Sequence, residues 1–202
     1  LLCALCIATI YPFVHVAAAS FSEPDRLISH TGMLVRPLGF TVAGYERVLA
    51  NPNVLRGFVN SSLYVVLGTA AKMVFTILGA YVLSRRNLLW GKAIAFGIVF
   101  TMFFDGGLIP RYFIVRDLGL LNNPVAIVLP RLIITYNMII MRTYFMSLPD
   151  SLEESARMDG ANDLTILVRI LLPLSGAVTA VLVLFYGVAL WNTWFEALIY
   201  LR

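Results

Sequence analysis

Long apolar runs constrain this chain more than any other feature. Five of them stand out, each close to the ~20 residues with which a helix crosses a bilayer. They cover residues 1–19, 59–83, 93–113, 124–145 and 177–201. Leu, Ile, Val, Phe and Ala dominate these runs, and none has the strict alternation of a barrel strand. The sequence therefore predicts an all-α, polytopic membrane helical bundle, with the third run interrupted at Asp105-Gly106-Gly107.

Composition supports the same class of protein. The chain is 60% hydrophobic and 13% charged, whereas soluble domains average roughly 45–50% and about 25%. The net charge of +4 comes from scattered cations rather than a basic cluster, so a nucleic acid is not an expected partner. Cys3 and Cys6 lie in an apolar run without a neighbouring ligand, which indicates packing cysteines rather than a metal or redox site.

The segments between the runs give the expected topology. The chain begins at Leu1 and ends at Arg202 within or beside apolar runs, so we expect it to be a piece of a longer protein. Within the polar residues 20–58, residues 41–49 are predicted to form an amphipathic helix at the membrane interface, ending at Asn51-Pro52. Three cations in residues 85–92 favour the cytoplasmic side for that loop, and hence for residues 147–175. The loops around residues 20–58 and 105–110 then face outward.

Residues 147–175 are unusually polar for this chain. Ser151 and Glu154 have the spacing of a capping box at a helix start. Glu153 and Arg157 are four residues apart and are expected to pair on the helix surface. Gly160 is predicted to end this helix in a left-handed conformation.

A second short helix is predicted to follow this glycine. Asn162 or Asp163 is suited to cap its start, and Pro173 is expected to stop it or to kink it into the last run. Its apolar face is expected to comprise Leu164, Leu167, Val168 and Leu171. Two short helices joined at a glycine would form a compact elbow with one charged and one apolar half.

The elbow carries a family resemblance. Residues 154–161 read E-S-A-R-M-D-G-A and residues 170–173 read I-L-L-P. This closely resembles the EAA signature of binding-protein-dependent ABC importer permeases, E-A-A-x-x-D-G-A followed by I-x-L-P. Ser155 replaces an alanine, and Ala177 stands where many members have a second proline.

The resemblance extends along nearly the whole chain and favours the carbohydrate branch. The chain is similar to the smaller maltose-type permease subunit, and most similar to the subgroup for alginate and pectin oligosaccharides. The segments that carry this likeness are residues 40–41, 44–45, 60–61, 80–85, 100–104, 106–110, 142–145 and 191–194. It implies a type I ABC importer permease fold, with residues 1–202 forming one transmembrane domain and five of a probable six spans present.

The resemblance also implies how the elbow works. In the family, the elbow is the coupling helix, which sits in a groove of the cytoplasmic ATPase subunit. The coupling residues carried over to this chain are Glu154, Ser155, Ala156, Asp159, Gly160, Ala161, Leu172 and Pro173. The implied partners are a second homologous permease subunit, forming a heterodimer, an ABC ATPase dimer holding ATP and Mg, an extracellular or periplasmic solute-binding protein, an oligosaccharide and membrane lipid. The implied location is the bacterial cytoplasmic membrane.

The chain itself is expected to be a transport subunit without a bound cofactor, and not an enzyme. Gly91-Lys92 is followed by Ala93 and lacks the earlier glycine of a phosphate-binding loop. His15 and His30 are isolated in the sequence and have no companion of the kind that forms a catalytic or metal site.

Polar residues within the apolar runs give a candidate pathway. Lys72, Arg131 and Glu196 are ionisable, and such residues are costly in a membrane and usually face protein or water. Sugars are bound by hydrogen bonds and aromatic stacking. The candidate pathway residues are Tyr136, Asn137, Trp191, Asn192, Trp194 and Glu196. The alternative is that the tryptophans form an interface belt and that Lys72 packs between helices or snorkels.

The sequence favours a permease of an ATP-driven importer for oligosaccharides, of the alginate or pectin type. One alternative is a stand-alone secondary transporter, which predicts internal repeats with matching broken helices; none is evident. Another is an ABC permease for a solute other than a sugar.

Overall fold

The structure of the chain is a computed structural model that describes residues 2–85 and 87–201. It divides into two units, Leu1–Asn60 and Ser61–Arg202. Within the described residues the regular elements are all helical, and the only β pairing is an isolated bridge between Ser22 and Phe40. The predicted all-α class is confirmed.

The first unit contains three helices and the start of a fourth, which are α1 (Leu2–Ser20), α2 (Pro24–Ile28), α3 (Ala43–Ala50) and α4 (Pro52–Ser84). The segment between α2 and α3 returns to the end of α1. There the Ser22 hydroxyl accepts a hydrogen bond from the Leu38 N–H at 2.9 Å, and Phe21 stacks on Phe40 with centroids 5.5 Å apart. The helix predicted over residues 41–49 is confirmed, while its position at the membrane interface stays a prediction.

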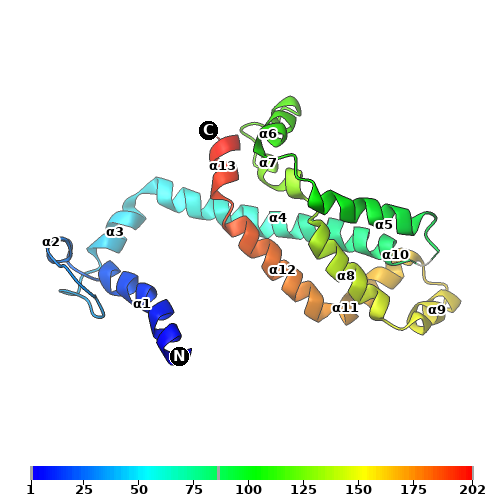
Figure 1. The fold of residues 1–202 in the computed structure, drawn as a ribbon, viewed down its shortest axis with the longest axis horizontal. Helices are drawn as coiled ribbons and strands as arrows, with labels where there is room; N and C mark the ends of the chain where they lie inside the picture. The colour runs from blue at the N-terminus through cyan, green and yellow to red at the C-terminus, as the bar shows by residue number, and fades with distance from the viewer. Residues whose placement is uncertain (1, 86, 202) are drawn as a thin grey trace. The chain divides into compact units, whose positions relative to one another are not determined.

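The second unit contains the rest of α4 and all later elements (Figure 1). These are α5 (Gly91–Phe100), η1 (Thr101–Phe103), α6 (Leu108–Asp117), α7 (Val125–Val128), η2 (Leu129–Arg131), α8 (Thr135–Ser147), α9 (Asp150–Met158), α10 (Asp163–Ile166), η3 (Leu167–Leu171), α11 (Leu172–Leu174), α12 (Gly176–Trp191) and α13 (Trp194–Tyr200). The short turn η3 is π-helical, whereas η1 and η2 are 3-10 turns.

Among the described residues, two helices, α1 and α4, are long and apolar enough to span a membrane, and up to five spans result if each bent pair counts as one. The bends measure 114° between Gly91–Phe103 and Leu108–Asp117, 57° between Val125–Arg131 and Thr135–Ser147, and 86° between Asp163–Leu174 and Gly176–Trp191. The predicted interruption after residue 103 is confirmed.

Two of the predicted runs differ from the structure. Residues 124–145 were expected to be one span, but they bend between η2 and α8. Residues 177–201 were also expected to be one span, but α12 ends at Trp191 and α13 begins at Trp194. In each case an apolar composition continues across a break that the backbone makes, so composition alone gives no signal for it.

Side chains donate hydrogen bonds to backbone carbonyls at the bends. The Tyr144 hydroxyl donates to the Leu174 carbonyl at 2.9 Å, and the fully buried Ser175 hydroxyl donates to the Leu171 carbonyl at 2.6 Å. Lys72 Nζ donates to the Arg131 carbonyl at 2.6 Å. Irregular backbone persists at membrane depth only where protein or water satisfies it, so these bonds explain how the bent helices are tolerated.

The second unit has two apolar clusters. The larger joins α4, α8, α9, α10, η3 and α12, and at its centre the buried Tyr186 hydroxyl shares a hydrogen bond with Thr76 at 2.7 Å. The smaller joins α6, α7 and α13 through Val115, Ala126 and Tyr200. Figure 1 shows α9, α10 and α11 at the end of this unit where α4 and α8 terminate, and α6, α7 and α13 at the opposite end.

Candidate functional site

The elbow between α9 and α10 is formed by a Schellman turn. Gly160 has φ of 81°, its N–H donates to the Arg157 carbonyl at 3.0 Å, and the Ala161 N–H donates to the Ala156 carbonyl at 2.9 Å. These are the two bonds of that motif, which needs a residue without a Cβ penalty at the left-handed position. Ala156 is buried and Ala161 packs against the larger core. The predicted left-handed end at Gly160 is confirmed, and the motif's small residues position the turn.

The start of α9 differs from the prediction. The helix begins at Asp150 after Pro149, and no side chain caps it, so Ser151 lies inside the helix and the expected capping box with Glu154 is wrong. Proline fixes φ in a helix-compatible range, and with Pro149 as N-cap the helix begins two residues earlier than a Ser151 cap predicts. The carboxylates of Asp150 and Glu153 are in the first turn, where they favour the positive end of the helix dipole.

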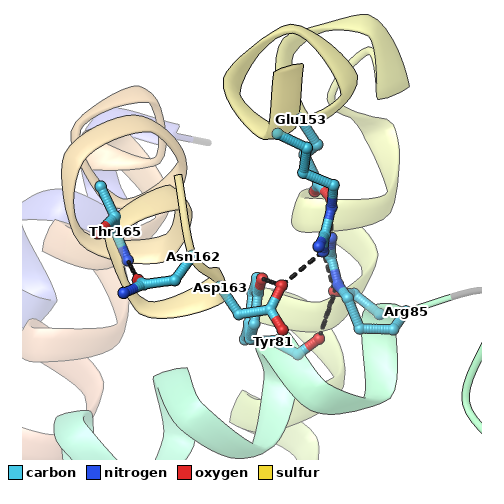
Figure 2. Close-up of polar contacts among 8 residues, drawn as sticks. Tyr81, Arg85, Glu153, Asn162, Asp163 and Thr165 are labelled. Atoms are coloured by element: carbon cyan, nitrogen blue, oxygen red, sulfur yellow. Dashed lines mark hydrogen bonds and ion pairs between the residues drawn. The ribbon is translucent and has the colours of Figure 1, made fainter. Parts of the chain in front are cut away.

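The start of α10 agrees with one of the two predicted caps. The Asn162 side-chain oxygen accepts a hydrogen bond from the Thr165 N–H at 2.8 Å (Figure 2). Asp163 is then free to use its carboxylate elsewhere. The expected apolar face is partly wrong, because Leu167 and Leu171 are buried whereas Leu164 and Val168 are exposed. The π-helical turn η3 departs from the 3.6-residue period on which that face was predicted.

The acidic residues of the elbow bind partners other than the predicted ones. Glu153 forms its ion pair with Arg85, and Arg157 forms its own with Asp163 at 2.5 Å, so the expected Glu153–Arg157 pair is wrong. Arg85 follows α4 directly, and its side chain and that of Glu153 are only 21% and 19% exposed. Figure 2 shows Arg85 extending from the end of α4 toward Glu153 on α9. A half-buried, charge-assisted bond outweighs a surface pair worth a few tenths of a kcal/mol.

Further contacts fix the end of α4 to the elbow. The Tyr81 hydroxyl donates to Asp163 at 3.2 Å, and the Arg85 guanidinium lies 4.3 Å from the centroid of the Tyr81 ring. Arg142 on α8 donates to the Leu83 carbonyl at 2.8 Å. The loop that begins at Arg85 and the elbow therefore lie at one end of the second unit, as the predicted topology requires; the side of the membrane stays a prediction.

The eight predicted coupling residues divide by exposure. Ala156 is buried and half-buried Ala161 and Leu172 pack against the core, so these three position the elbow. The exposed members are Glu154, Ser155, Asp159, Gly160 and Pro173. Beside them lies a polar hollow of about 680 Å³ whose lining includes Arg85, Asn87, Glu153, Glu154, Arg157 and Asp163. This arrangement offers a partner protein a charged surface held by a rigid turn.

The six predicted pathway residues do not form one site. Asn192 and Glu196 line a cavity of about 160 Å³ together with Lys72, Arg111, Arg131 and Tyr200. Tyr136, Trp191 and Trp194 are 56%, 52% and 71% exposed and are not in this lining, and Asn137 is buried outside it. The cavity thus unites all three ionisable residues singled out from the apolar runs, but only two of the six candidates.

Sequence reasoning missed several residues of these sites. Tyr81 and Arg85 lie in a segment that carries the family resemblance, which gave them a signal but no role. Arg111 and Tyr200 lie in the apolar runs 93–113 and 177–201, and no motif there indicated a role for either. Among the residues that the structure describes, no group of three or more His, Cys, Asp or Glu side chains is placed to hold a metal ion.

Comparisons with known proteins give the family. Residues 88–201 match the family described as the binding-protein-dependent transport system inner membrane component. The polygalacturonan/rhamnogalacturonan transport system permease protein YtcP of Bacillus subtilis is 41% identical, covering 96% of this chain and 67% of its own length. Protein LplC of the same organism is 39% identical, covering 96% of this chain and 65% of its own length. The chain thus spans about two thirds of the curated relatives it matches.

A solved structure agrees with these relatives. A chain from the crystal structure of a bacterial ABC transporter involved in the import of the acidic polysaccharide alginate matches with a TM-score of 0.95 and 34% identity. The match covers 100% of this chain and 71% of that one. The predicted type I permease fold is confirmed, and the chain belongs to the family of binding-protein-dependent transport system inner membrane components.

Proposed function

We propose that this chain is one permease subunit of an ATP-driven importer that carries oligosaccharides across the cytoplasmic membrane. The observation that carries the proposal is the elbow at Gly160, whose exposed acidic side chains sit on a turn fixed to the end of α4 by Arg85–Glu153 and Tyr81–Asp163. A protrusion of this kind is what a separate soluble subunit needs in order to move membrane-embedded helices.

The mechanism follows from these contacts. ATP and Mg bound to the ATPase dimer would supply the energy, and this chain's residues receive the movement. Glu154 and Asp159 offer carboxylates to cationic or N–H donors of the ATPase, while Gly160 sets the angle between the two short helices. The Arg85–Glu153 ion pair and the Tyr81–Asp163 hydrogen bond then pass a displacement of the elbow to α4. Alternating access arises from such rigid-body movements of helix bundles.

The proposed assembly contains a second permease subunit, an ATPase dimer and an external solute-binding protein. Extensive exposed apolar surface supports contact with lipid and another subunit. In α1, for example, only 6% of the span is buried. A stand-alone carrier does not need an exposed acidic elbow for binding a soluble subunit outside the membrane.

The names of the relatives support a carbohydrate substrate. YtcP is a permease for polygalacturonan and rhamnogalacturonan, and the solved transporter imports alginate. Among more distant relatives, NgcG of Streptomyces coelicolor is a diacetylchitobiose uptake permease at 28% identity. Sugars of the pectin or alginate type are therefore the substrates we propose, and import of a non-sugar solute by the assembled complex would contradict this part.

Site-specific crosslinking tests the elbow. Cys3 and Cys6 are first changed to serine, and Met158→Cys, at a position 89% exposed on α9, is crosslinked in membranes that contain the whole importer. The product expected is an adduct with the ATPase subunit. Leu118→Cys, at a position 62% exposed directly after α6, is the matched control and should give no such adduct. Capture of the ATPase from the control position but not from the elbow would contradict the proposal.

Charge reversal tests the same contact by function. Glu154→Lys should reduce ATP-driven uptake and the amount of ATPase that co-purifies, because it replaces an exposed acceptor with a donor. Asp117→Lys, an equally conspicuous change on α6, should leave both unchanged. Normal uptake by Glu154→Lys would remove this residue from the contact.

A further inference from the structure

We infer that the cavity between α4, α6, η2 and α13 binds the carboxylate of an acidic sugar residue during transport, an inference that rests on the function proposed above. The cavity has a volume of about 160 Å³. Pockets that enclose a whole drug-sized ligand measure roughly 300–1,000 Å³, so this one fits one part of a chain-like ligand. A single charged sugar ring, or the carboxylate of that ring, is small enough to fit the cavity.

Cations outnumber acids among the lining residues, and they come from three elements. Lys72 lies on α4, Arg111 on α6 and Arg131 at the end of η2, while Glu196 on α13 is the one acid among the lining residues. Asp105, in the break before α6, holds Arg111 at 2.8 Å and lies 3.7 Å from Arg131. Even with Asp105 offsetting Arg111, a positive excess faces the cavity.

Lys72 is the most informative of the three cations. Its residue is only 4% exposed, and among the described residues it forms no ion pair. Its one hydrogen bond to the described residues goes to the Arg131 carbonyl at 2.6 Å, and Nζ also lies 5.8 Å from the centroid of the Tyr186 ring. An ammonium has three donors. A buried charge in a membrane segment is costly unless paired. The bond to the carbonyl explains the position of the side chain. Glu196 is the one acid that lines the cavity with three cations, so an anion bound there would supply further countercharge.

Tyr200 gives an independent indication of a ligand. Its side chain is 1% exposed, it lines the same cavity, and its hydroxyl has no hydrogen-bond partner among the described residues. Buried polar groups are almost always hydrogen-bonded, so an unpaired one requires an explanation. A carboxylate accepts hydrogen bonds through two oxygens, and one that meets Lys72 and Arg131 can also accept from this hydroxyl.

The cavity lies at a depth in the membrane that a transported sugar has to pass. Lys72 precedes Arg85 by about 20 Å along α4, at a rise of about 1.5 Å per residue. The hydrocarbon core of a bilayer is about 30 Å thick, so Lys72 lies well inside the membrane from the elbow end. A site at this depth contacts the sugar after the external binding protein has released it. It would therefore bind the oligosaccharide during its passage through the membrane.

The test uses the whole importer in proteoliposomes with its binding protein and ATP. The probes are trigalacturonate and the same trisaccharide with its carboxyl groups methyl-esterified, which removes the charge while keeping the sugar. The variants are Lys72→Gln, Arg131→Gln and Tyr200→Phe. Arg116→Gln, which removes a cation of α6 that does not line the cavity, is the control. The quantity compared is the ratio of acidic to esterified uptake, so the preference of the binding protein cancels between variants.

Loss of one partner of a desolvated charged contact is expected to lower the ratio about tenfold for Lys72→Gln. Arg131→Gln should lower it by a smaller factor, because that side chain is 53% exposed. Tyr200→Phe should lower it less, and Arg116→Gln should not change it. If the ester is not carried, the KM for the acid takes the place of the ratio and should rise about tenfold. An equal fall for both probes, or an unchanged ratio, would overturn the inference. Arg131→Gln decides the matter if Lys72→Gln fails to assemble. A wild-type importer that carries neither probe nor any other oligosaccharide would instead contradict the proposed function.

Discussion

The two ends of the second unit, the elbow and the cavity, differ in how completely their charged and polar side chains are paired. At the elbow, Arg85 and Glu153 bind each other, and Asp163 accepts from both Arg157 and Tyr81. At the cavity, Lys72 has one carbonyl partner and Tyr200 has a buried hydroxyl without a partner among the described residues. The chain itself closes the first network. In the second, Asp105 pairs with Arg111 and Arg131, but the donors of Lys72 and Tyr200 are left incompletely satisfied.

This difference in pairing indicates that the elbow and the cavity have different functions. Polar groups that satisfy one another hold a structure rigid, and a fully satisfied network specifies one arrangement. Polar groups that are buried but incompletely satisfied favour a ligand that completes them. The elbow is therefore suited to transmit force, and the cavity is suited to hold and release a charged group.

The largest expected effect comes from breaking the closed network. Glu153→Arg places two guanidinium groups together and loses a charge-assisted bond worth about 1.5–3 kcal/mol. ATP-driven uptake in proteoliposomes should fall by about tenfold or more. Combining it with Arg85→Glu should restore part of the activity, although the swapped glutamate cannot donate to Ser84 and Tyr81 as Arg85 does.

The control for this change is Glu46→Arg, which reverses an exposed acid on α3. It should leave uptake unchanged. Full activity of Glu153→Arg, or a double variant no better than the single one, would mean that the ion pair does not carry the movement.

The next effect concerns the angle of the elbow. Gly160→Ala puts a Cβ at a φ of 81° and should cost about 1–2 kcal/mol. We expect weaker retention of the ATPase on the purified permease, measured by co-purification. Gly176→Ala is the matched control, because a Cβ there meets nothing within 4 Å and φ is not in the left-handed region. Equal retention by the two variants would show that the elbow tolerates another geometry.

Paired tyrosine changes compare the two ends directly. Tyr81→Phe removes the hydroxyl that binds Asp163 and keeps the ring beneath Arg85, so the permease should lose about 0.5–1.5 kcal/mol of stability. Tyr200→Phe removes a buried hydroxyl that has no partner among the described residues, and should be neutral or stabilising without sugar. Thermal unfolding of the purified importer measures both. A larger loss for Tyr200→Phe than for Tyr81→Phe would reverse the comparison.

The smallest effect is expected from a surface pair that belongs to neither end's network. Arg116 and Asp117 form an ion pair with side chains 50% and 65% exposed. Exposed pairs of this kind contribute roughly 0–1 kcal/mol. Arg116→Gln should therefore leave thermal stability and uptake within error of the wild type, and a clear loss of either would place Arg116 in a contact with another subunit.

Much of the fold could be predicted because the membrane imposes a local rule. Each apolar run is long enough to span, and that signal adds up over about 20 neighbouring residues. The break at Asp105-Gly106-Gly107 was also readable, since glycines there weaken the helix. The bend before Thr135 and the break after Trp191 could not be predicted. The groups that stabilise the first of them are distant in the sequence. Lys72, for example, satisfies the carbonyl of Arg131, 59 residues later.

The same distinction holds for the sites. The turn at Gly160 and the cap at Asn162 depend on residues within a few positions, so their pattern predicts them. Arg85, the partner of Glu153, lies 68 residues away, directly after α4, and Tyr81 on α4 lies 82 residues from Asp163. A single sequence favours the local pair Glu153–Arg157 instead, because nothing in it reports that the end of α4 returns to α9. Tyr200 was missed for the same reason, since its cavity is assembled from six separate elements.

The unbroken course of α4 bears on both ends at once. Its only proline is the first residue, and no break interrupts the helix between Lys72 and Ser84, which directly precedes Arg85. A continuous hydrogen-bonded helix transmits rotation and translation along its whole length, whereas the bent helices of this unit can flex at their breaks. A rotation or translation of the end of α4 beside Arg85 therefore also moves Lys72. The ion pair at the elbow and the cation in the cavity are mechanically coupled through this helix.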